Sequence, residues 1–371
     1  MFVKNATVEA IIEAILTMDV QQDQVVLIAL GYKNKPDIPI LIQSIKNTGV
    51  SFMGGVFPGV IHECNCFAEG AVLFVFPSAS PPYLVKNLSG AEYTLPDISL
   101  KKGLEPKYTA VVFIDGLSSN IAGFLNSLFN LYGNSVNYIG GGAGYIGLQQ
   151  KPCVFNAEGI FQDAAIVALI AQESRLGVGH GWKRIVGPII ATRTYGNIIA
   201  ELNWESAFEV YRSVVEEYSG QKIDVDNFFG VAKDYPFGML KENCESVVRS
   251  PRGVTSNGEL ICFSEVPENT VVDILAGDKE SLLDAAGAVA ASCGTDLKEG
   301  VAKSAIVIEC VARSMFLKED FTQELSAVSE SISKNTGAKL LGGILTFGEI
   351  ASWEGFLQYF NKTIVTGVFY D

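Results

Sequence analysis

The sequence carries the same pattern of segments three times, and this repetition constrains the fold more than any single motif. In the first copy, an apolar run at Val25 to Leu30 precedes a helical stripe at Asp37 to Thr48, the glycine-broken run VSFMGGVFPGVI and the apolar run AVLFVF. The second copy begins at Ala110 and the third at Ala305. From the first strand to the glycine pair the spacing is 29, 30 and 37 residues. Three copies at similar spacing predict three equivalent structural units.

Each copy is typical of a strand, a crossover helix, a second strand with a glycine break, and a return strand. A helix between two strand-like runs favours a right-handed crossover that packs against a sheet. Glycines suit a sharply bent strand, because the missing Cβ permits positive φ or close approach of another backbone. The predicted fold is therefore a mixed α/β (α+β) protein with helix-covered sheets in two lobes. The pattern leaves open whether the copies share one sheet or form two stacked sheets.

The segment between the second and third copies predicts a different order of strands and helices. Residues 181–202 predict two strands around the turn Tyr195-Gly196-Asn197, followed by a helix from Trp204 to Tyr218. A hairpin is predicted around Ser256-Asn257-Gly258, and a helix from about Asp278 to Ser292. The polar stretch after Gly220 is the best candidate boundary. We therefore expect a first domain at 1–220, with two copies of the unit, and a second domain at 221–371, with the third copy.

Charge and cysteine content exclude several classes of protein. The 27 basic and 41 acidic side chains give a net charge of −14, the wrong sign for binding nucleic acid or an anionic membrane surface. The seven scattered cysteines favour a reducing compartment. The N-terminus predicts an amphipathic helix at residues 7–16 rather than a secretory signal. The longest apolar run, 164–171, is far below the ~18 residues of a membrane span, so a cytoplasmic protein is expected.

Gly142, Gly144 and Gly147 match the G-x-G-x-x-G spacing of a dinucleotide-binding loop. Such a loop requires a helix to start within the glycines, because the helix N-terminus holds the pyrophosphate. Here the β-type run Cys153-Val154-Phe155 follows instead, so we interpret the glycines as structural. The chain also lacks the P-loop, G-x-S-x-G, H-E-x-x-H and C-x-x-C motifs, which leaves an enzymatic function unsupported.

Two groups of residues are weak candidates for metal or haem iron. His62, Cys64 and Cys66 alternate, so on one strand all three side chains would lie on one face. That face could hold zinc or haem iron, or it could simply line a core strand, which is the more frequent role of such residues. His180 lies between glycines in VGHGW, where a turn residue or an exposed ligand both fit, and we favour the turn. No cofactor is therefore expected, with haem as the alternative.

Arg313 and Glu349 are the strongest candidates for binding a polar ligand. Arg313 follows the apolar run AIVIEC, and Glu349 ends the glycine-broken run ILTFGE. Charges at strand ends in a sheet with crossovers lie where ligands usually bind. A buried carboxylate ligand would need a guanidinium partner. The alternative is an ion pair between the two residues, or with Arg249 or Arg252.

Several segments together resemble the FIST sensory proteins (F-box and intracellular signal transduction). The similarity lies in GGGAG followed by CVFNAEGIFQDAAIVALI, in GHGWKRIVGPIIATRTYGNIIAELNWESAFEVY, in IECVAR, and in GGILTFGEI with FNKTIV. It extends from about Val25 to the last residue. The resemblance implies an N-terminal and a C-terminal FIST domain that meet near residue 220. It also implies a sensory module that binds small molecules such as amino acids.

The resemblance also carries candidate site residues and partners. By position these residues are Trp182, Asn197, Cys310, Arg313, Gly343, Glu349 and Asn361. Where many relatives have histidine before the asparagine, this chain has Phe360, which implies a more apolar pocket or a different ligand. Relatives are often joined to signalling domains that have no room here, so we expect a stand-alone sensor with a separate signalling partner. Some relatives are described as haem-binding sensors of nitric oxide, which keeps His62 and His180 as candidates.

The leading hypothesis is a sensory protein that binds a small polar metabolite such as an amino acid. In it, Arg313 and Glu349 orient the ligand, and aromatic residues such as Trp182 and Phe347 surround it. The alternatives are a haem-binding gas sensor, an enzyme that uses Cys310 as nucleophile beside Glu349, and a scaffolding protein. A buried and inert Cys310 thiol is the more frequent outcome for such a strand.

Overall fold

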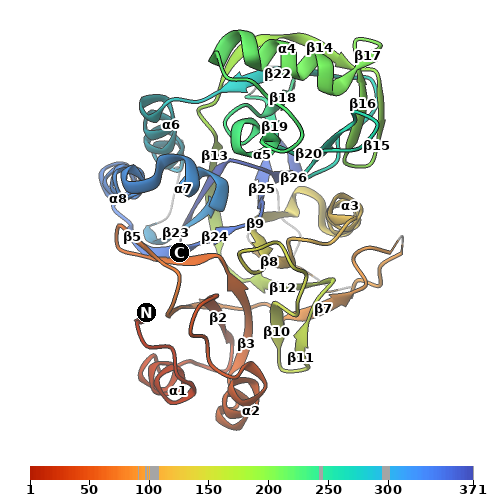
Figure 1. Cartoon of the computed structure of the whole chain (residues 1–371). Coiled ribbons are helices and arrows are strands. Elements are labelled where there is room, and N and C mark those ends of the chain that lie inside the picture. Colours follow the sequence, from red (N-terminus) through yellow and green to blue (C-terminus); the bar gives the residue numbers. More distant parts are fainter. Residues whose placement is uncertain are drawn as a thin grey trace.

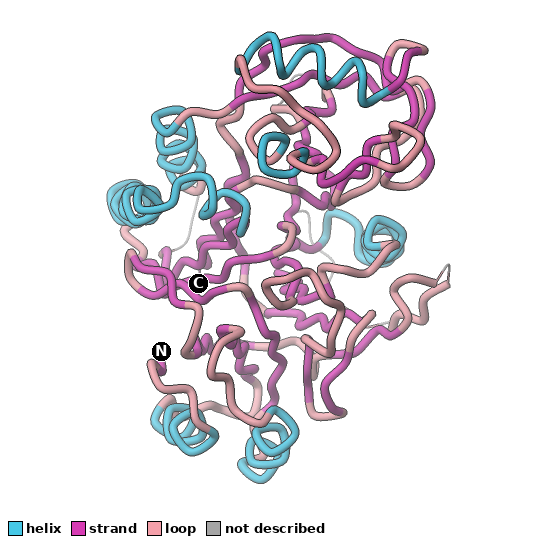
Figure 2. The backbone as a smooth tube through the Cα atoms, viewed as in Figure 1, coloured by secondary structure: helices cyan, strands magenta, loops and turns pink. Residues whose placement is uncertain are grey.

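Each of the three repeats builds a six-stranded sheet. The computed structural model describes residues 1–90, 92–96, 98, 100, 108–241, 245–294 and 301–370. The three sheets and their helices form one lobe, which includes α6 (Lys279–Ser292), and residues 183–276 of the described chain form the other (Figures 1 and 2). The mixed α/β fold with two lobes agrees with the prediction, and the repeats form three separate sheets.

The first sheet shows the plan of all three. Its order is β1-β6-β2-β3-β10-β11, and the parallel pair β2 and β3 is joined by the crossover helix α2. Strand β6 returns antiparallel to β2. The bounds are β1 (Phe2–Val3), β2 (Gln24–Gly31), α2 (Ile38–Thr48), β3 (Ser51–Phe57), β6 (Ala71–Pro77), β10 (Val154–Asn156) and β11 (Gly159–Phe161).

The second and third sheets repeat this order with other segments. The second is β7-β12-β8-β9-β25-β26, with β7 (Tyr83–Lys86), β8 (Tyr108–Asp115), β9 (Val136–Ala143), β12 (Ala164–Ile170), β25 (Glu349–Trp353) and β26 (Phe356–Phe360). The third is β13-β27-β23-β24-β4-β5, with β4 (Gly59–His62), β5 (Asn65–Phe67), β13 (Glu173–Gly179), β23 (Ala302–Cys310), β24 (Lys339–Thr346) and β27 (Ile364–Tyr370).

The hairpin that follows each glycine-broken strand leaves its own unit and joins a neighbouring sheet. Hairpin β4–β5 of the first unit pairs with β24 of the third, β10–β11 of the second with β3 of the first, and β25–β26 of the third with β9 of the second. The exchange is therefore cyclic. Strands from both sides of residue 220 share the second and third sheets, and the predicted domain boundary there stays a prediction.

The helices begin and end at residues with the expected capping chemistry. Asp37, Asn120 and Asp278 each accept a backbone N–H at the start of a helix, and Gly49 and Gly337 end helices in the left-handed region. Figure 1 shows the helices outside the sheets. They are α1 (Val8–Thr17), α3 (Ile121–Tyr132), α4 (Ala207–Ser219), α5 (Phe228–Ala232), α6 (Lys279–Ser292), α7 (Val311–Leu317) and α8 (Phe321–Thr336), with short 3-10 turns at Gly133–Ser135 and Lys318–Asp320.

The repeated glycines allow neighbouring backbones to approach closely, as predicted. A Cβ on Gly140 would lie 1.9 Å from the carbonyl oxygen of Val112, and a Cβ on Gly343 would lie 2.0 Å from that of Val307. Both are contacts between the parallel strands of one unit. Because no side chain fits at these distances, the glycines determine how each parallel pair bends.

The second lobe contains two small sheets. One has the order β14-β22-β18-β19 and the other β15-β16-β21-β20, with β17 beside β16. The sequence predicted two strands in 181–202, but the structure divides the first of them, because β14 pairs with β22 and only β15 pairs with β16. The strands are β14 (Lys183–Ala191), β15 (Arg193–Tyr195), β16 (Ile198–Leu202), β17 (Glu205–Ser206), β18 (Phe237–Met239), β19 (Val247–Arg249), β20 (Pro251–Val254), β21 (Leu260–Cys262) and β22 (Thr270–Ala276).

Apolar side chains fill the space between the sheets. One continuous cluster joins strands of all three units, and Phe57 of the first unit packs edge to face on Phe113 of the second at 5.0 Å. Within the described residues, no helix combines the length and the apolar character that crossing a membrane requires.

Candidate ligand-binding site

The parallel strands β23 and β24 end at the same edge of the third sheet, where polar side chains collect. Cys310 is the last residue of β23, and Thr346 is the last residue of β24. Glu349 begins β25, and Thr363 directly precedes β27. Ligands of α/β sheets generally bind beyond the carboxyl ends of parallel strands, so this edge is the natural place to look for a site.

Glu349 is a fully buried carboxyl group in this cluster. The Thr346 hydroxyl lies 2.9 Å from its Oε1, and the backbone N–H of Thr363 donates to its Oε2 at 3.2 Å. Burial raises the pKa of Glu349 to about 8. At neutral pH the group is therefore mostly protonated. It can then donate to the Thr346 oxygen, which leaves the Thr346 hydrogen for the carbonyl of Glu309, 3.2 Å away.

Cys310 lies beside Glu349 but lacks the properties of a nucleophile. Its Sγ accepts the backbone N–H of Lys362 at 3.2 Å, and only 4% of the residue is exposed. Burial raises the pKa of the Cys310 thiol far above its ordinary value. Because the thiolate is the reactive form, a neutral thiol here argues against the enzyme hypothesis based on Cys310 and Glu349.

Arg313 is fully buried in α7, and contacts within the protein occupy its guanidinium. Nη2 pairs with Glu324, Nε lies 3.6 Å from a carboxylate oxygen of Glu309, and Nη1 donates to the carbonyl of Lys362 at 3.2 Å. Burial, and next the neighbouring Glu324 carboxylate, raise the pKa of Glu309. Arg313 lines neither of the two cavities described below. Its contacts support an ion-pair role in the core.

Lys362 occupies the turn between β26 and β27 in the left-handed region, with φ 56°. Only 1% of it is exposed. Its Nζ donates to the carbonyl of Lys233 at 2.5 Å and lies 4.6 Å from the ring centroid of Trp182, a cation–π distance. Burial lowers the pKa of Lys362 to about 8. In the described chain no carboxylate lies within 4.0 Å of Nζ, so this buried ammonium has no direct ion-pair partner, and the Asp234 carboxylate acts on it only from a greater distance.

An apolar cavity of about 280 Å³ opens directly beside Cys310 and Lys362. We name it the Cys310 cavity. Its walls come from the loop after β9, from the second lobe and from the edge of the third sheet. The lining residues are Ile146, Gly147, Leu148, Phe229, Lys233, Ser250, Pro251, Phe263, Cys310, Val311, Ala312, Met315, Phe347, Asn361 and Lys362.

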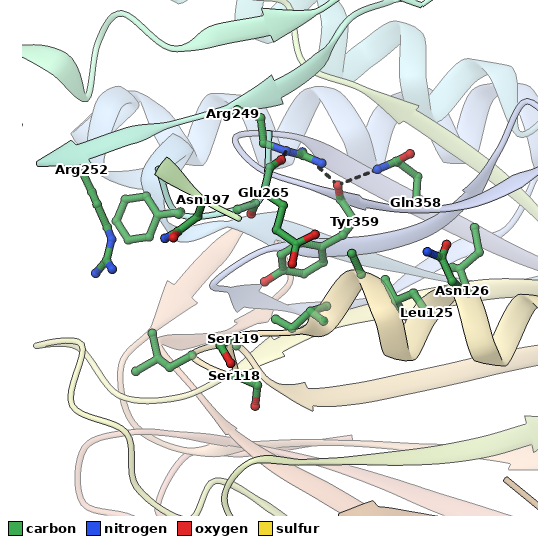
Figure 3. A pocket seen from close by; sticks show the side chains of 17 residues that line it. Ser118, Ser119, Leu125, Asn126, Asn197, Arg249, Arg252, Glu265, Gln358 and Tyr359 are labelled. Atoms are coloured by element: carbon green, nitrogen blue, oxygen red, sulfur yellow. Dashed lines mark hydrogen bonds between the residues drawn. The ribbon is translucent and has the colours of Figure 1, made fainter. Parts of the chain in front are cut away.

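A second and more polar cavity, of about 360 Å³, lies on the other side of Phe263. We name it the Arg249 cavity (Figure 3). It is enclosed by the start of α3, by two strand ends of the second lobe and by β26. Its lining residues are Gly116, Leu117, Ser118, Ser119, Ile121, Ala122, Leu125, Asn126, Asn197, Arg249, Arg252, Phe263, Ser264, Glu265, Leu357, Gln358 and Tyr359.

Arg249 carries a buried positive charge without a carboxylate partner. The residue is 5% exposed, its Nε donates to the carbonyl of Glu265 at 2.8 Å, and its Nη1 donates to those of Val248 and Tyr359 at 3.0 and 3.2 Å. Within the described residues its Nη2 makes no hydrogen bond and no carboxylate approaches within 4.0 Å. Burial lowers the pKa of Arg249 to about 10. The guanidinium is thus a charged donor with free capacity at the cavity.

Comparison with known families identifies this architecture. A model of the FIST N domain matches residues 20–205, and a model of the FIST C domain matches residues 207–352. The chain belongs to the FIST family. FIST domains are associated with sensing in signal transduction. No curated protein matches the chain significantly.

Both cavities lie where the FIST N and FIST C regions meet. Residues 116–126 and Asn197 of the Arg249 cavity belong to the FIST N match, and residues 249–265 belong to the FIST C match. In the Cys310 cavity, the loop 146–148 comes from FIST N and the remaining residues up to Phe347 come from FIST C. Binding pockets occur preferentially at interfaces of this kind.

The FIST-like residues predicted from the sequence are distributed over several places. Cys310 and Asn361 line the Cys310 cavity, and Asn197 lines the Arg249 cavity. The Asn361 side chain accepts from the Ser264 hydroxyl at 3.0 Å, which links the two cavities. Trp182 lies under Lys362, and Gly343 packs between strands. Arg313 and Glu349 are fully buried and line neither cavity.

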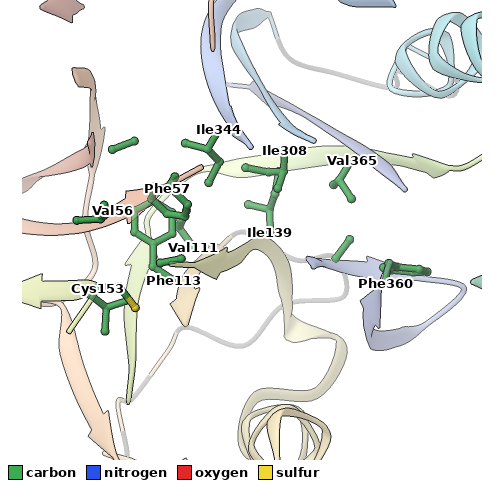
Figure 4. Packing of buried hydrophobic residues seen from close by; sticks show 14 of the residues in the cluster. Val56, Phe57, Val111, Phe113, Ile139, Cys153, Ile308, Ile344, Phe360 and Val365 are labelled. Carbon is green, nitrogen blue, oxygen red and sulfur yellow. The ribbon is translucent and has the colours of Figure 1, made fainter. Parts of the chain in front are cut away.

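Phe360, which the sequence analysis connected with a more apolar pocket or a different ligand, lies in the core. It is 3% exposed, lines neither cavity, and packs edge to face on Trp353 at 5.7 Å. Figure 4 shows it among buried residues of the central cluster. Phe360 therefore belongs to the packing of the core beside the site rather than to the lining of a cavity.

Sequence reasoning missed Lys362 and considered Arg249 only as a partner for Arg313 or Glu349. Lys362 stands between the apolar runs FLQYF and TIVTGVF, and Arg249 stands in SVVRSP. A single cation inside an otherwise apolar strand region was the available signal, because charged residues are seldom buried without a reason. Whether such a cation is available to a ligand depends on whether a carboxylate lies beside it in space, and the sequence does not show this.

The histidines do not form a metal site in the described residues. The sequence predicted His62, Cys64 and Cys66 on one strand face, but the chain turns at Glu63, with φ 53°, and His62 pairs with Asn65 across a tight hairpin. Both ring nitrogens of His180 are engaged, one by the N–H of Trp182 at 2.8 Å and one by Ser246 at 3.0 Å. Within the described chain no three His, Cys, Asp or Glu residues cluster as metal ligands do.

Proposed function

We propose that this FIST protein is a sensor that binds a small polar metabolite with a carboxylate group, such as an amino acid, in the Arg249 cavity. The observation that carries the proposal is the buried, unpaired guanidinium of Arg249. An uncompensated buried charge is unfavourable, and a ligand carboxylate that accepts from Nη2 would relieve it with a charge-assisted hydrogen bond. In a chain of net charge −14, such a local positive site is also selective for its anion.

Other groups of the Arg249 cavity fit the rest of an amino acid. The Ser118 hydroxyl is buried and makes no hydrogen bond within the described chain, so it has capacity for a ligand. Glu265 is half-buried on the same cavity and could meet an ammonium group (Figure 3). An amino acid would therefore find a cation for its carboxylate and an anion for its amine.

The position of the cavity suggests how occupancy would become a signal. Its walls come from both lobes, so a ligand that contacts both would favour one relative arrangement of them over another. A separate signalling protein would then read this arrangement. The proposed location is the cytoplasm, because the six cysteines of the described residues are free thiols and free thiols are typical of a reducing compartment.

Ligand screening with an Arg249 variant tests the proposal. Native mass spectrometry of the purified protein would reveal a retained ligand, and thermal-shift measurements with amino acids and dicarboxylates at millimolar concentration would reveal stabilising ones. Arg249→Met should weaken binding of the stabilising compound at least about tenfold while the apo protein stays folded, since the buried charge it removes is unpaired.

Arg193→Met is the matched control. It removes the same charge from the second lobe at an exposed surface pair with Glu201, outside both cavities. We expect it to leave the affinity unchanged. Equal affinity of wild type and Arg249→Met would overturn the proposal, as would the absence of any stabilising compound in the panel.

A further inference from the structure

The Cys310 cavity has the chemistry of a second binding site, separate from the Arg249 cavity. Phe347, Phe263 and Pro251 form apolar walls. Its volume of about 280 Å³ is just below the ~300 to 1,000 Å³ usual for small-molecule pockets. A ligand that covers these apolar walls removes their surface from water, which favours binding.

The rim of the Cys310 cavity is unusually apolar for a protein surface. Ile146, Leu148, Phe229 and Met315 line it, and each is among the exposed large hydrophobic residues, with exposed fractions of 42% to 53%. These residues come from three separate parts of the chain and meet only here. A contiguous group of exposed apolar residues around a cavity is typical of a binding site, whereas single exposed apolar residues are common on any protein surface.

Polar groups with unused capacity lie on the inner side of this apolar cavity. Lys362 lines it, and its ammonium has one hydrogen-bond acceptor, the carbonyl of Lys233, out of three possible. The Ser250 hydroxyl also lines it, is 4% exposed at the residue level, and makes no hydrogen bond within the described chain. Two independent groups thus have donors available to an acceptor inside the cavity.

We propose that the Cys310 cavity binds a small carboxylic acid with an apolar body, such as a medium-chain aliphatic acid. The carboxylate accepts hydrogen bonds from Lys362 and Ser250, and the hydrocarbon part contacts the aromatic walls and the rim. The carboxylate supplies the direct ion-pair partner that the buried ammonium lacks. An uncharged ligand of the same length contacts the same apolar walls but gives the Lys362 ammonium no ion-pair partner.

Octanoate and octan-1-ol are the probes that test this site. We expect octanoate to bind the wild-type protein at least about tenfold more tightly than octanol in isothermal titration calorimetry. Lys362→Met should remove this preference, so that the two probes bind with similar affinity. Equal binding of octanoate and octanol to the wild-type protein would overturn the proposal.

A second variant keeps the test decisive if Lys362→Met does not fold. Ala312→Phe fills part of the cavity and keeps the Lys362 side chain, and it should weaken both probes at least about tenfold. An unchanged affinity of the Ala312→Phe variant for octanoate would show that octanoate binds elsewhere, and would overturn the proposal. Arg249→Met should leave octanoate binding unchanged, and this separates failure of the present site from failure of the amino acid site.

Discussion

Arg313, Arg249 and Lys362 are three buried cations with different surroundings. Arg313 has carboxylates of Glu309 and Glu324 beside it, whereas Arg249 and Lys362 donate only to backbone carbonyl oxygens. A buried cation without a counter-charge is the less favourable state. At the scale of residues, the second and third cations are therefore the ones that gain most from an incoming anion.

Glu349→Gln should change how stability depends on pH. The folded-state pKa of Glu349, about 8, lies above its ordinary value of 4.5. The folded protein therefore retains a proton that the unfolded chain releases, and this contribution to stability is complete below about pH 4.5 and is lost as the pH rises toward 8. In urea unfolding, the wild type should lose on the order of 2 kcal/mol between pH 6.5 and 8 from this group, and Glu349→Gln should not.

The difference between the two proteins isolates Glu349, because other titrating groups are common to both. His180, whose pKa burial lowers to about 3, gains or loses its proton below this window in the folded state. Parallel pH profiles for wild type and Glu349→Gln would contradict the prediction.

At the scale of elements, each unit depends on glycines where its two parallel strands approach. In β24 the Cβ position of Gly343 faces the carbonyl of Val307 at 2.0 Å. In helix α6, by contrast, the Cβ position of Gly287 has nothing within 4 Å. The same residue type therefore has a steric role in the strand and none in the helix.

Alanine at these two glycines should have opposite effects. Gly343→Ala places a methyl group against backbone and should lower the free energy of unfolding by about 3 kcal/mol or more. Gly287→Ala should raise it by roughly 0.5 to 1 kcal/mol, because alanine restricts the unfolded chain and favours a helix. Urea unfolding measures both free energies. A similar effect of the two substitutions would show that the close contact between Gly343 and Val307 does not require glycine.

At the scale of the whole molecule, the cyclic exchange of hairpins makes the three units depend on one another. The third sheet takes β4–β5 from the first unit and β13 from the end of the second, and the second sheet takes β25–β26 from the third. Side chains of all three units also meet in one core (Figure 4). Cutting the chain therefore leaves strand edges and apolar faces without partners.

A fragment of residues 1–220 should not fold cooperatively by itself. It lacks β24 and β27, with which β4 and β13 pair, and it lacks β25, which pairs with β9. Circular dichroism in urea should show no sharp transition for this fragment. An equimolar mixture with residues 221–371 should regain the transition, whereas a sharp transition of the fragment alone would contradict the dependence inferred here.

Local patterns in the sequence determined the elements and their order. The apolar runs, the helical stripe from Asp37 to Thr48 and the recurring glycines predicted the three units, because strand, helix and turn preferences act over a few neighbouring residues. The resemblance to FIST proteins was likewise carried by local segments. The split of β14 from β15 escaped prediction, because its cause is pairing with the distant strand β22.

Only the tertiary structure decided which unit each hairpin joins and which charges are paired. Arg313 and Arg249 look alike in the sequence, yet one meets carboxylates from other elements and the other faces a cavity. Burial and electrostatic partnership depend on residues more than a hundred positions apart, as in the bond from Arg249 to Tyr359. The candidate sites therefore emerged only once the lobes were placed against each other, because a cavity is a property of surfaces that meet in space.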